Sequence, residues 1–260
     1  MSDERPVIRL LHHLARTGGT TIAKCIAVMP KVALLSEIHP LGMDRISPLH
    51  QAKNWYGLVD EREIGQWSAN PDFVTAVRLI TQRASAKGLR LVIRDWSHID
   101  FHEGPLTRTP SFRLTTAELL APHFRLLQVA TVRHPIDHWQ SLRRTPIMRG
   151  QINLDRFLQG YRRFAEIAAV LGFVRFEDFC DDPDRSLQRI CAALDLVYDP
   201  TWRERWARYD HMTGDDTAKR DAGELRRPKR RLLEPGLADA FQKHPDYRPA
   251  LDLLGYGHPL

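Results

Sequence analysis

The sequence predicts an α/β protein in which helices cover both faces of a central parallel sheet, giving three layers. Short and nearly unbroken apolar runs, such as residues 126–132, are typical of strands that are buried on both faces. Segments with a helical pattern, such as residues 154–171, alternate with these runs along the chain. This β-α-β-α order favours parallel strands joined by right-handed crossovers.

Turn residues and helix-start residues delimit the elements of the N-terminal half. Two threonines after a glycine pair begin a helix, and Pro71 stands near the first turn of another, which ends before Gly88. A loop rich in His, Pro and Gly is expected over residues 39–50, followed by a Trp-rich helical segment that ends at Trp67. The expected strands are residues 7–14, 32–36 and 89–94, and the expected longer helices are residues 20–29 and 71–87.

The C-terminal half continues the same alternation. After a loop over residues 96–115, the sequence Thr115-Thr116-Ala117-Glu118 has the pattern of a helix cap with an acidic third residue. The expected strands are residues 124–132 and 173–176, and the expected helices are residues 154–171 and 183–194, the first of which ends at Gly172. Because no internal repeat or linker interrupts the order, we expect one domain over residues 1–260.

The segment that follows the first strand has the features of a phosphate cradle. Gly18 and Gly19 permit a tight turn and leave room for an anion to approach the backbone amides. Thr20 and Thr21 then open a helix, whose free N–H groups and dipole favour a negative group. Arg16 adds a positive charge within the loop. The spacing Gly-x4-Gly-Lys-[Ser/Thr] is missing, so this is not the usual nucleotide-binding loop.

A second stretch distinguishes between kinds of phosphate-binding protein. In a P-loop nucleotide hydrolase, the strand over residues 126–132 would end in an aspartate that holds Mg²⁺, but here Arg133 follows it. This cation disfavours Mg²⁺–ATP chemistry and favours a second anion at the carboxyl edge of the sheet. Ser141 comes eight residues later in a segment of helical pattern. An arginine and a hydroxyl donor together suit one terminal phosphate.

Together these two stretches resemble the paired signature of sulfotransferases that use 3′-phosphoadenosine 5′-phosphosulfate, including the bacterial type. That signature is a strand–[Lys/Arg]-x-Gly-x-Thr-Thr–helix loop with Arg-x7-Ser after a later strand. The resemblance implies a P-loop-like sulfotransferase fold in which Arg133 and Ser141 hold the 3′-phosphate. It also implies a loop that holds the 5′-phosphosulfate, formed by Arg16, Thr17, Gly18, Gly19, Thr20 and Thr21.

Two later segments extend the resemblance to residue 220. Residues 173–179, followed by Asp182-Pro183 and a helix, resemble the family's Arg-Tyr-Glu-Asp segment. Phe176 stands where that segment has tyrosine, so any hydrogen bond that the tyrosine makes is lost. Residues 213–220 resemble the glycine–basic loop that closes over the cofactor and would supply Gly214, Lys219 and Arg220. The resemblance thus implies transfer of a sulfuryl group to a hydroxyl or amine of a small-molecule or carbohydrate acceptor. The product nucleotide would be adenosine 3′,5′-bisphosphate, and no metal would be needed.

Transfer to a hydroxyl needs a base for the proton and fixed donors for the charge on the departing phosphate. Arg16 and the loop amides would hold that charge, and the candidate bases Glu37, Asp95 and His98 each follow an expected strand. We favour Glu37, which leaves its strand beside the cradle, as does the glutamate used by some bacterial and Golgi-type relatives. His98 sits two residues late against the family's Lys-Thr-His and can instead be a loop histidine on the surface. Either carboxylate can instead be structural, Glu37 as a cap or salt bridge and Asp95 as an ion pair with Arg94.

Composition leaves one alternative function open. A formal net charge of +6 suits a polyanionic ligand but suits nucleic acid equally. The alternative is therefore a non-catalytic nucleotide-binding or polyanion-binding protein of P-loop-like fold. We find no aromatic residues interleaved with basic ones in the manner of nucleic-acid grooves, so no nucleic-acid partner is expected. The basic run over residues 226–231 is interpreted as a solvated face.

The remaining composition indicates a cytoplasmic protein without a metal or a membrane span. Its three cysteines are few and odd in number and lack a zinc-ligand spacing, so we expect buried free thiols in a reducing compartment. The sequence Met-Ser-Asp-Glu-Arg-Pro at the start has neither signal-peptide nor transit-peptide features. No apolar run approaches the length of a transmembrane helix.

Overall fold

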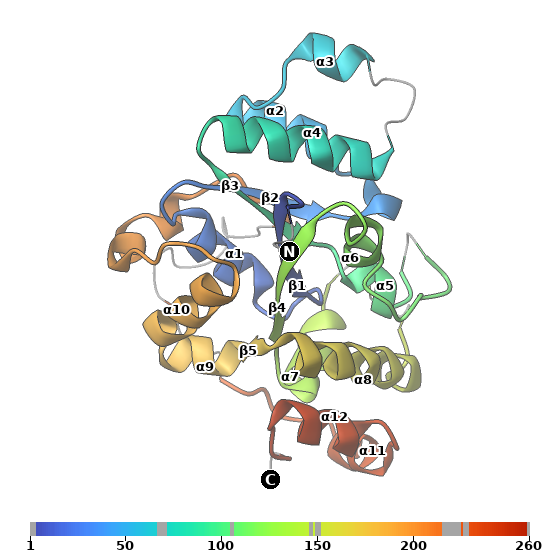
Figure 1. Ribbon diagram of the computed structural model, residues 1–260. Helices are drawn as coiled ribbons and strands as arrows, with labels where there is room; N and C mark the ends of the chain where they lie inside the picture. The colour runs from blue at the N-terminus through green and yellow to red at the C-terminus, as the bar shows by residue number, and fades with distance from the viewer. Residues whose placement is uncertain are drawn as a thin grey trace.

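The structure is a computed structural model that describes residues 4–66, 72–104, 107–145, 148, 152–214, 225 and 229–258. Five parallel strands form one sheet in this part of the chain, in the order β2-β3-β1-β4-β5 (Figure 1). The strands are β1 Val7–His13, β2 Val32–Ile38, β3 Arg90–Asp95, β4 Arg125–Val132 and β5 Phe173–Arg175. The predicted α/β class with a central parallel sheet is confirmed.

Helices connect the strands and cover the sheet. The α-helices before β4 are α1 Gly19–Ala27, α2 Pro48–Tyr56, α3 Glu61–Gln66, α4 Phe73–Ala86, α5 His98–Phe101 and α6 Thr115–Leu120. Those after β4 are α7 Pro135–Leu142, α8 Leu154–Leu171, α9 Phe176–Asp181, α10 Pro183–Ala193, α11 Leu237–Lys243 and α12 Tyr247–Leu254. Short 3-10 helices are η1 Pro40–Gly42, η3 Pro200–Glu204 and η4 Trp206–Arg208.

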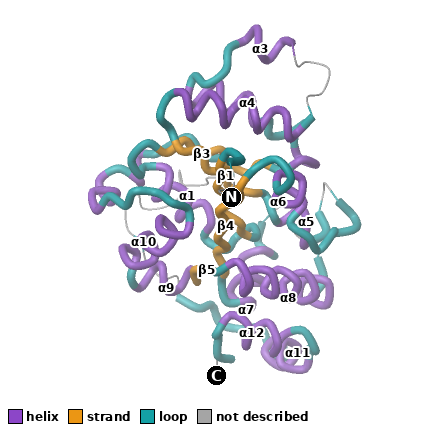
Figure 2. The backbone as a smooth tube through the Cα atoms, in the orientation of Figure 1, coloured by secondary structure: helices purple, strands orange, loops and turns teal. Residues whose placement is uncertain are grey.

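The sheet separates two hydrophobic cores, because neighbouring residues of a strand point to opposite faces. Leu10 of β1 packs in one core with side chains of α4, α6 and α8, such as Phe164. The next residue, Leu11, packs in the other core with side chains of α1, α9 and α10, such as Ile22. Figures 1 and 2 show these two groups of helices on opposite sides of the strands. The predicted three layers are therefore present.

Several element boundaries differ from the prediction, for local reasons. The expected loop over residues 39–50 contains η1 and the start of α2, where Ser47 accepts a hydrogen bond from the backbone N–H of His50 and Pro48 holds the first turn. Phe176 opens α9 and does not extend β5. Helices α11 and α12 lie beyond the last predicted element, and α12 packs on α8. Trp67 and Pro71 lie outside the described residues.

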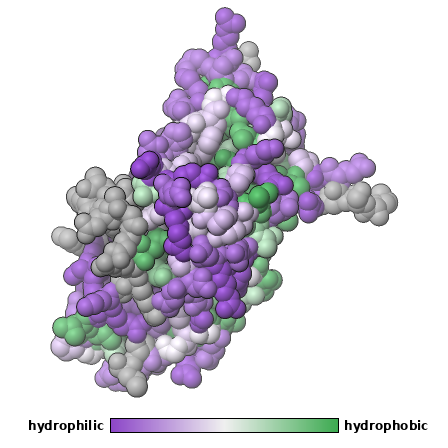
Figure 3. All heavy atoms as spheres, turned by 90° about the vertical axis from the view of Figure 1, so that its left-hand side faces the viewer, coloured by the Kyte–Doolittle hydropathy of each residue, from purple (hydrophilic) through white to green (hydrophobic). Residues whose placement is uncertain are grey.

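The cysteines and the surface bear on the expectations from composition. Cys25 and Cys191 are buried free thiols, as predicted, whereas the free thiol Cys180 is only half-buried. Polar residues cover most of the face in Figure 3, and the apolar residues there lie in small separate patches. Among the helices of the described residues, none combines the length and the hydropathy that crossing a bilayer requires.

The carboxyl ends of the four longer strands meet at one edge of the sheet, which is where parallel α/β sheets bind ligands. This edge carries the loop between β1 and α1, the end of β2, the β3–α5 turn and the β4–α7 turn. The register of β2 against β3 shifts here, because Ser36 pairs with Arg94 and Ile38 with Asp95. Glu37 is the extra residue of this bulge and has a φ of +57°.

Close packing of α8 against α5 gives a first prediction. A Cβ atom at Gly160 would collide with the backbone carbonyl of Phe101, and neither backbone can move without disturbing the core. We expect Gly160→Ala to lower the free energy of unfolding by about 1–3 kcal/mol in urea titrations. Gly65→Ala is the control, because open space surrounds this residue of α3, and it should leave stability unchanged or raise it slightly. Equal stability of the two variants would contradict this packing.

Candidate functional site

The loop between β1 and α1 is shaped by two residues with positive φ. These are Arg16 at +70°, which is uncommon for a residue other than glycine, and Gly18 at +87°. Thr17 fixes the turn, since its hydroxyl donates to the carbonyl oxygen of Leu14 at 2.7 Å and its side chain is buried. No side chain of the described residues caps α1, and its first turn has no acidic residue. Its N–H groups therefore stay available to an anion.

Both glycines of this loop are required by the aromatic rings packed against it. A Cβ atom at Gly18 would collide with the ring of Phe176, which begins α9. A Cβ atom at Gly19 would collide with the ring of His13, at the end of β1. Burial, aided by the charge of Arg94, lowers the pKa of His13 well below its usual value, so that this ring is neutral. Sequence reasoning predicted the glycines but not the role of His13.

The two predicted phosphate sites touch each other in the structure. The Nε atom of Arg16 donates to the hydroxyl of Ser141 on α7 at 3.4 Å, across 125 residues of sequence. The Nη1 atom of Arg133 donates to the backbone oxygen of Arg16 at 3.2 Å, and its guanidinium lies 5.4 Å from the ring centroid of Phe176. Burial lowers the pKa of Arg133, although a guanidinium group remains protonated in proteins. Two guanidinium groups and a hydroxyl thus gather beside the glycine turn.

Glu37 lies beside the cradle, on the bulge at the end of β2. Its side chain is 18% exposed, and its Oε1 atom accepts a hydrogen bond from Arg94 Nη2 at 3.3 Å. The same Nη2 atom donates to the hydroxyl of Thr20, in the first turn of α1, at 2.9 Å. One nitrogen atom therefore joins the favoured base to the cradle. The left-handed backbone at Glu37 is strained, as is common at functional sites.

Arg94 is the main site residue that sequence reasoning missed. It is buried, at 2% exposure, and its Nη1 atom donates to Ser36 Oγ at 2.7 Å and to the backbone oxygen of Thr213 at 3.1 Å. Its Nε atom donates to His13 Nε2 at 3.1 Å. An arginine near the end of an otherwise apolar strand was the available signal, because a buried guanidinium needs several acceptors.

The start of the predicted glycine–basic loop is anchored at this edge of the sheet. The hydroxyls of Thr213 and Ser36 are hydrogen-bonded at 2.8 Å. Gly214 lies against Glu37, since a Cβ atom there would stand 2.9 Å from Oε1 of the carboxylate. Lys219 and Arg220 lie outside the described residues. The described part of this loop thus adjoins the favoured base.

Asp95 is engaged in structural contacts and is fully buried. Its carboxylate accepts hydrogen bonds from His12 Nδ1 at 2.8 Å and from the hydroxyls of Ser97 and Thr116, both at 2.6 Å. Although burial alone would raise the pKa of Asp95, the hydrogen bonds from His12 and Ser97 and the charges of His12 and His39 hold it below its usual value. The proposed ion pair with Arg94 is wrong, because adjacent residues of β3 point to opposite faces.

His98 belongs to a cluster of three buried histidines between α5, α7 and α8. Its ring stacks on His102 at 4.8 Å between centroids, and His102 meets His138 edge-on at 5.9 Å. Within the described part of the chain, none of the six ring nitrogens has a hydrogen-bond partner. Burial lowers the pKa of His98 to about 4, and burial with mutual repulsion lowers those of His102 and His138 well below the usual value. His98 is thus enclosed among the side chains of this cluster.

The basic run near the C-terminus is not simply a solvated face. Arg230 forms a bidentate ion pair with Asp137 of α7, with contacts of 2.8 to 3.2 Å. Arg231 Nη1 donates to the backbone oxygen of Gln140 at 3.5 Å. Part of this run therefore lies on the helix that carries Ser141, whereas residues 226–228 lie outside the described residues. Over the same described ranges, no group of three or more His, Cys, Asp or Glu side chains is placed to hold a metal ion.

Two solved sulfotransferase domains share this architecture. The sulfotransferase domain from the Synechococcus PCC 7002 olefin synthase matches with a TM-score of 0.69 at 17% identity, covering 99% of this chain and 98% of that one. The sulfotransferase domain from the curacin biosynthetic pathway matches with a TM-score of 0.64 at 16% identity, covering 98% and 99%. No family model and no curated protein matches the sequence. The chain therefore has the sulfotransferase fold that the resemblance implied.

The histidine cluster predicts sensitivity to acid. Because the folded state keeps these rings neutral while the unfolded chain binds protons below about pH 6.5, stability should fall as the pH drops from about 6.5 towards 4. Each histidine contributes up to about 1.4 kcal/mol per pH unit to this loss. The measurement is urea unfolding at several pH values. His102→Leu should reduce the slope of the free energy of unfolding against pH, whereas exposed His50→Gln should leave that slope unchanged. An unchanged slope in His102→Leu would contradict the assignment.

Proposed function

We propose that this protein is a sulfotransferase that moves a sulfuryl group from 3′-phosphoadenosine 5′-phosphosulfate to a hydroxyl or amine of a small-molecule or carbohydrate acceptor. The observation that carries the proposal is the shared contact of Arg94 Nη2 with Thr20 and Glu37, which sets a carboxylate beside an anion cradle. The sulfotransferase fold supports it. A single domain over residues 1–260 and a cytoplasmic location remain predictions.

The donor set suits a nucleotide with phosphates at two positions. The uncapped first turn of α1, with Thr20, Thr21 and Arg16, would hold the 5′-phosphosulfate. Arg133 and Ser141 would hold the 3′-phosphate, with Phe176 packed between the guanidinium and the turn. When bound, the nucleotide supplies the sulfuryl group to be transferred. Arg16 and the loop amides would stabilise charge on the phosphate that departs.

Glu37 would accept the proton of the acceptor hydroxyl. Its carboxylate is partly exposed beside the cradle, whereas Asp95 and His98 are enclosed. The bulge at the end of β2 turns this one residue out of the regular pairing with β3. A non-catalytic polyanion-binding protein, the second candidate, would use the same cationic groups but would not need Glu37. The behaviour of Glu37 variants therefore separates the two functions.

Nucleotide selectivity tests the proposed phosphate sites. We expect adenosine 3′,5′-bisphosphate to bind more tightly than 5′-AMP by about 10- to 100-fold, because a charge-assisted pair contributes on the order of 1.5–3 kcal/mol. Arg133→Ala should abolish the difference in affinity between the two nucleotides without unfolding the protein. Arg62→Ala, at an exposed arginine of α3, should leave that difference unchanged. Isothermal titration calorimetry measures both affinities. Equal affinities in the unmodified protein would refute the sulfotransferase proposal.

Replacement of the base tests catalysis directly. Glu37→Gln keeps the shape of the side chain and removes its basicity, so turnover should fall by roughly 10²–10⁴ while the affinity for adenosine 3′,5′-bisphosphate barely changes. Exposed Glu204→Gln serves as the matched control. Normal turnover in Glu37→Gln with an inactive His98→Ala would assign the base to His98. If neither substitution matters, Asp95 is the next carboxylate to test.

Metal dependence provides an independent test. Since Arg16 and the helix amides would neutralise the leaving group, we expect sulfuryl transfer to continue at full rate in EDTA. The assay compares initial rates with EDTA and after addition of Mg²⁺. Activity that disappears with EDTA and returns with Mg²⁺ would contradict the proposed assignment of charges.

A further inference from the structure

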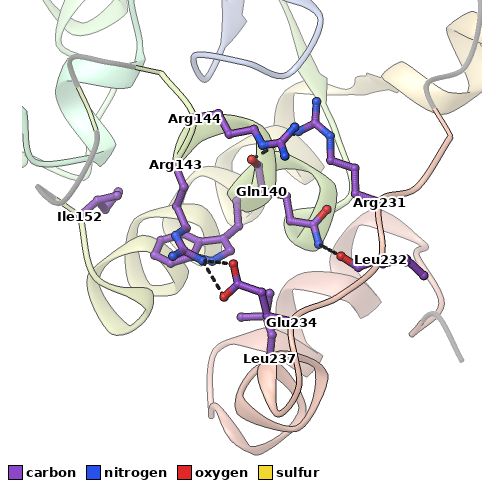
Figure 4. A pocket seen from close by; sticks show the side chains of 9 residues that line it. Gln140, Arg143, Arg144, Ile152, Arg231, Leu232, Glu234 and Leu237 are labelled. Atoms are coloured by element: carbon purple, nitrogen blue, oxygen red, sulfur yellow. Dashed lines mark hydrogen bonds and ion pairs between the residues drawn. The ribbon is translucent and has the colours of Figure 1, made fainter.

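A cavity of about 660 Å³ lies between α7 and the C-terminal segment 229–237, outside the site described above (Figure 4). Three arginines line it, Arg143 and Arg144 after α7 and Arg231 from the C-terminal segment. Trp139, together with Ile152 and Leu237, supplies apolar wall. Neither Arg133 nor Ser141 lines this cavity, nor does any residue of the glycine turn. The cavity therefore offers hydrogen-bond donors that are distinct from those of the candidate nucleotide site.

The cavity is held together by contacts between parts of the chain about ninety residues apart. Gln140 Nε2 donates to the backbone oxygen of Leu232, and Arg231 Nη1 donates to that of Gln140, both at 3.5 Å. The nearby ion pair of Arg230 with Asp137 fixes the segment on α7. The guanidinium of Arg143 lies 5.7 Å from the ring centroid of Trp139. These contacts set cationic groups beside an aromatic wall.

The lining carries excess positive charge. Glu234 is the one carboxylate among the lining residues, and it pairs with Arg143 at 3.3 Å. Within the described ranges, neither Arg144 nor Arg231 forms an ion pair. The charge of Arg231 also reaches Arg133, since it adds to the main effect of burial in lowering the pKa of that residue. An anion in the cavity would relieve this repulsion among guanidinium groups.

We propose that this cavity binds a small amphipathic anion, with a carboxylate, sulfonate or phosphate group on a ring or short alkyl body. The anionic group would contact Arg144 and Arg231, and the apolar body would pack on Trp139 and Leu237. The volume is within the range of sites for small organic ligands. This site is separate from the proposed nucleotide site, but α7 joins the two, because Arg231 donates to the backbone oxygen of Gln140, the residue before Ser141.

The coupling has a defined sign. An anion held by Arg231 reduces the positive potential at Arg133, so it should weaken binding of a nucleotide 3′-phosphate by a limited factor. By reciprocity, the nucleotide weakens binding of the anion by the same factor. Because the sites do not overlap, this weakening reaches a plateau as the concentration of the second ligand rises. Direct competition would show no plateau.

The test uses the full chain and the fluorescent probe 8-anilinonaphthalene-1-sulfonate, an aromatic monoanion. Its uncharged analogue N-phenyl-1-naphthylamine reports apolar binding alone. We expect one saturable site for the anionic probe. The double substitution Arg144→Glu and Arg231→Glu should weaken binding of the anionic probe by about tenfold or more, with little effect on binding of the uncharged probe. If that protein does not fold, Arg144→Gln with Arg231→Gln makes the same test.

The matched control changes net charge equally at exposed arginines outside the cavity, by Arg62→Glu with Arg108→Glu. It should leave the affinity for the anionic probe unchanged, and an equal loss would overturn the proposal as nonspecific attraction. Adenosine 3′,5′-bisphosphate should raise the apparent dissociation constant of the probe to a plateau. Displacement without a plateau would also overturn the proposal. If the nucleotide does not bind at all, the proposed function fails, while the probe experiment with the variants still decides this inference.

Discussion

The buried guanidinium of Arg94 is the interaction on which the candidate site depends. Removing such a charge from water costs several kcal/mol unless its donors are satisfied. Here the acceptors come from the ends of β1 and β2, from the first turn of α1 and from Thr213. The guanidinium therefore holds four separate segments in one arrangement. Glu37 belongs to that arrangement, because Arg94 also contacts its carboxylate.

Packing imposes a second constraint, at the glycine turn. The rings of His13 and Phe176 occupy the space that side chains at positions 19 and 18 would need. Only glycines, which have no side chain, therefore fit where the two rings contact the loop. The first turn of α1 has no side-chain cap. Phe176 carries no hydroxyl, but its ring contacts both the turn and Arg133. The role of Phe176 at this turn is therefore packing and not hydrogen bonding.

Neutral side chains surround the cationic groups on the inner side of the site. Burial keeps His98, His102 and His138 uncharged, and protonation of His138 is further opposed by Arg133 and Arg16. Arg16, Arg94 and Arg133 supply positive charge at this edge of the sheet, because a guanidinium group remains protonated in proteins. Protonation of the buried histidines therefore bears on the stability of the fold in acid and not on the charge of these arginines.

Local sequence determined the fold class and the glycine turn, and it singled out Arg133 and Ser141 as candidates, because apolar runs, helix starts and turn residues act over a few positions. Tertiary structure decided which groups meet. The contact of Arg16 with Ser141 spans 125 residues, and Asp95 pairs with His12 and not with its neighbour Arg94, because strand register and pleat set the direction of each side chain. The same holds for Arg94, which sequence reasoning missed, because its acceptors come from segments that lie far apart in the sequence and meet only in the folded chain.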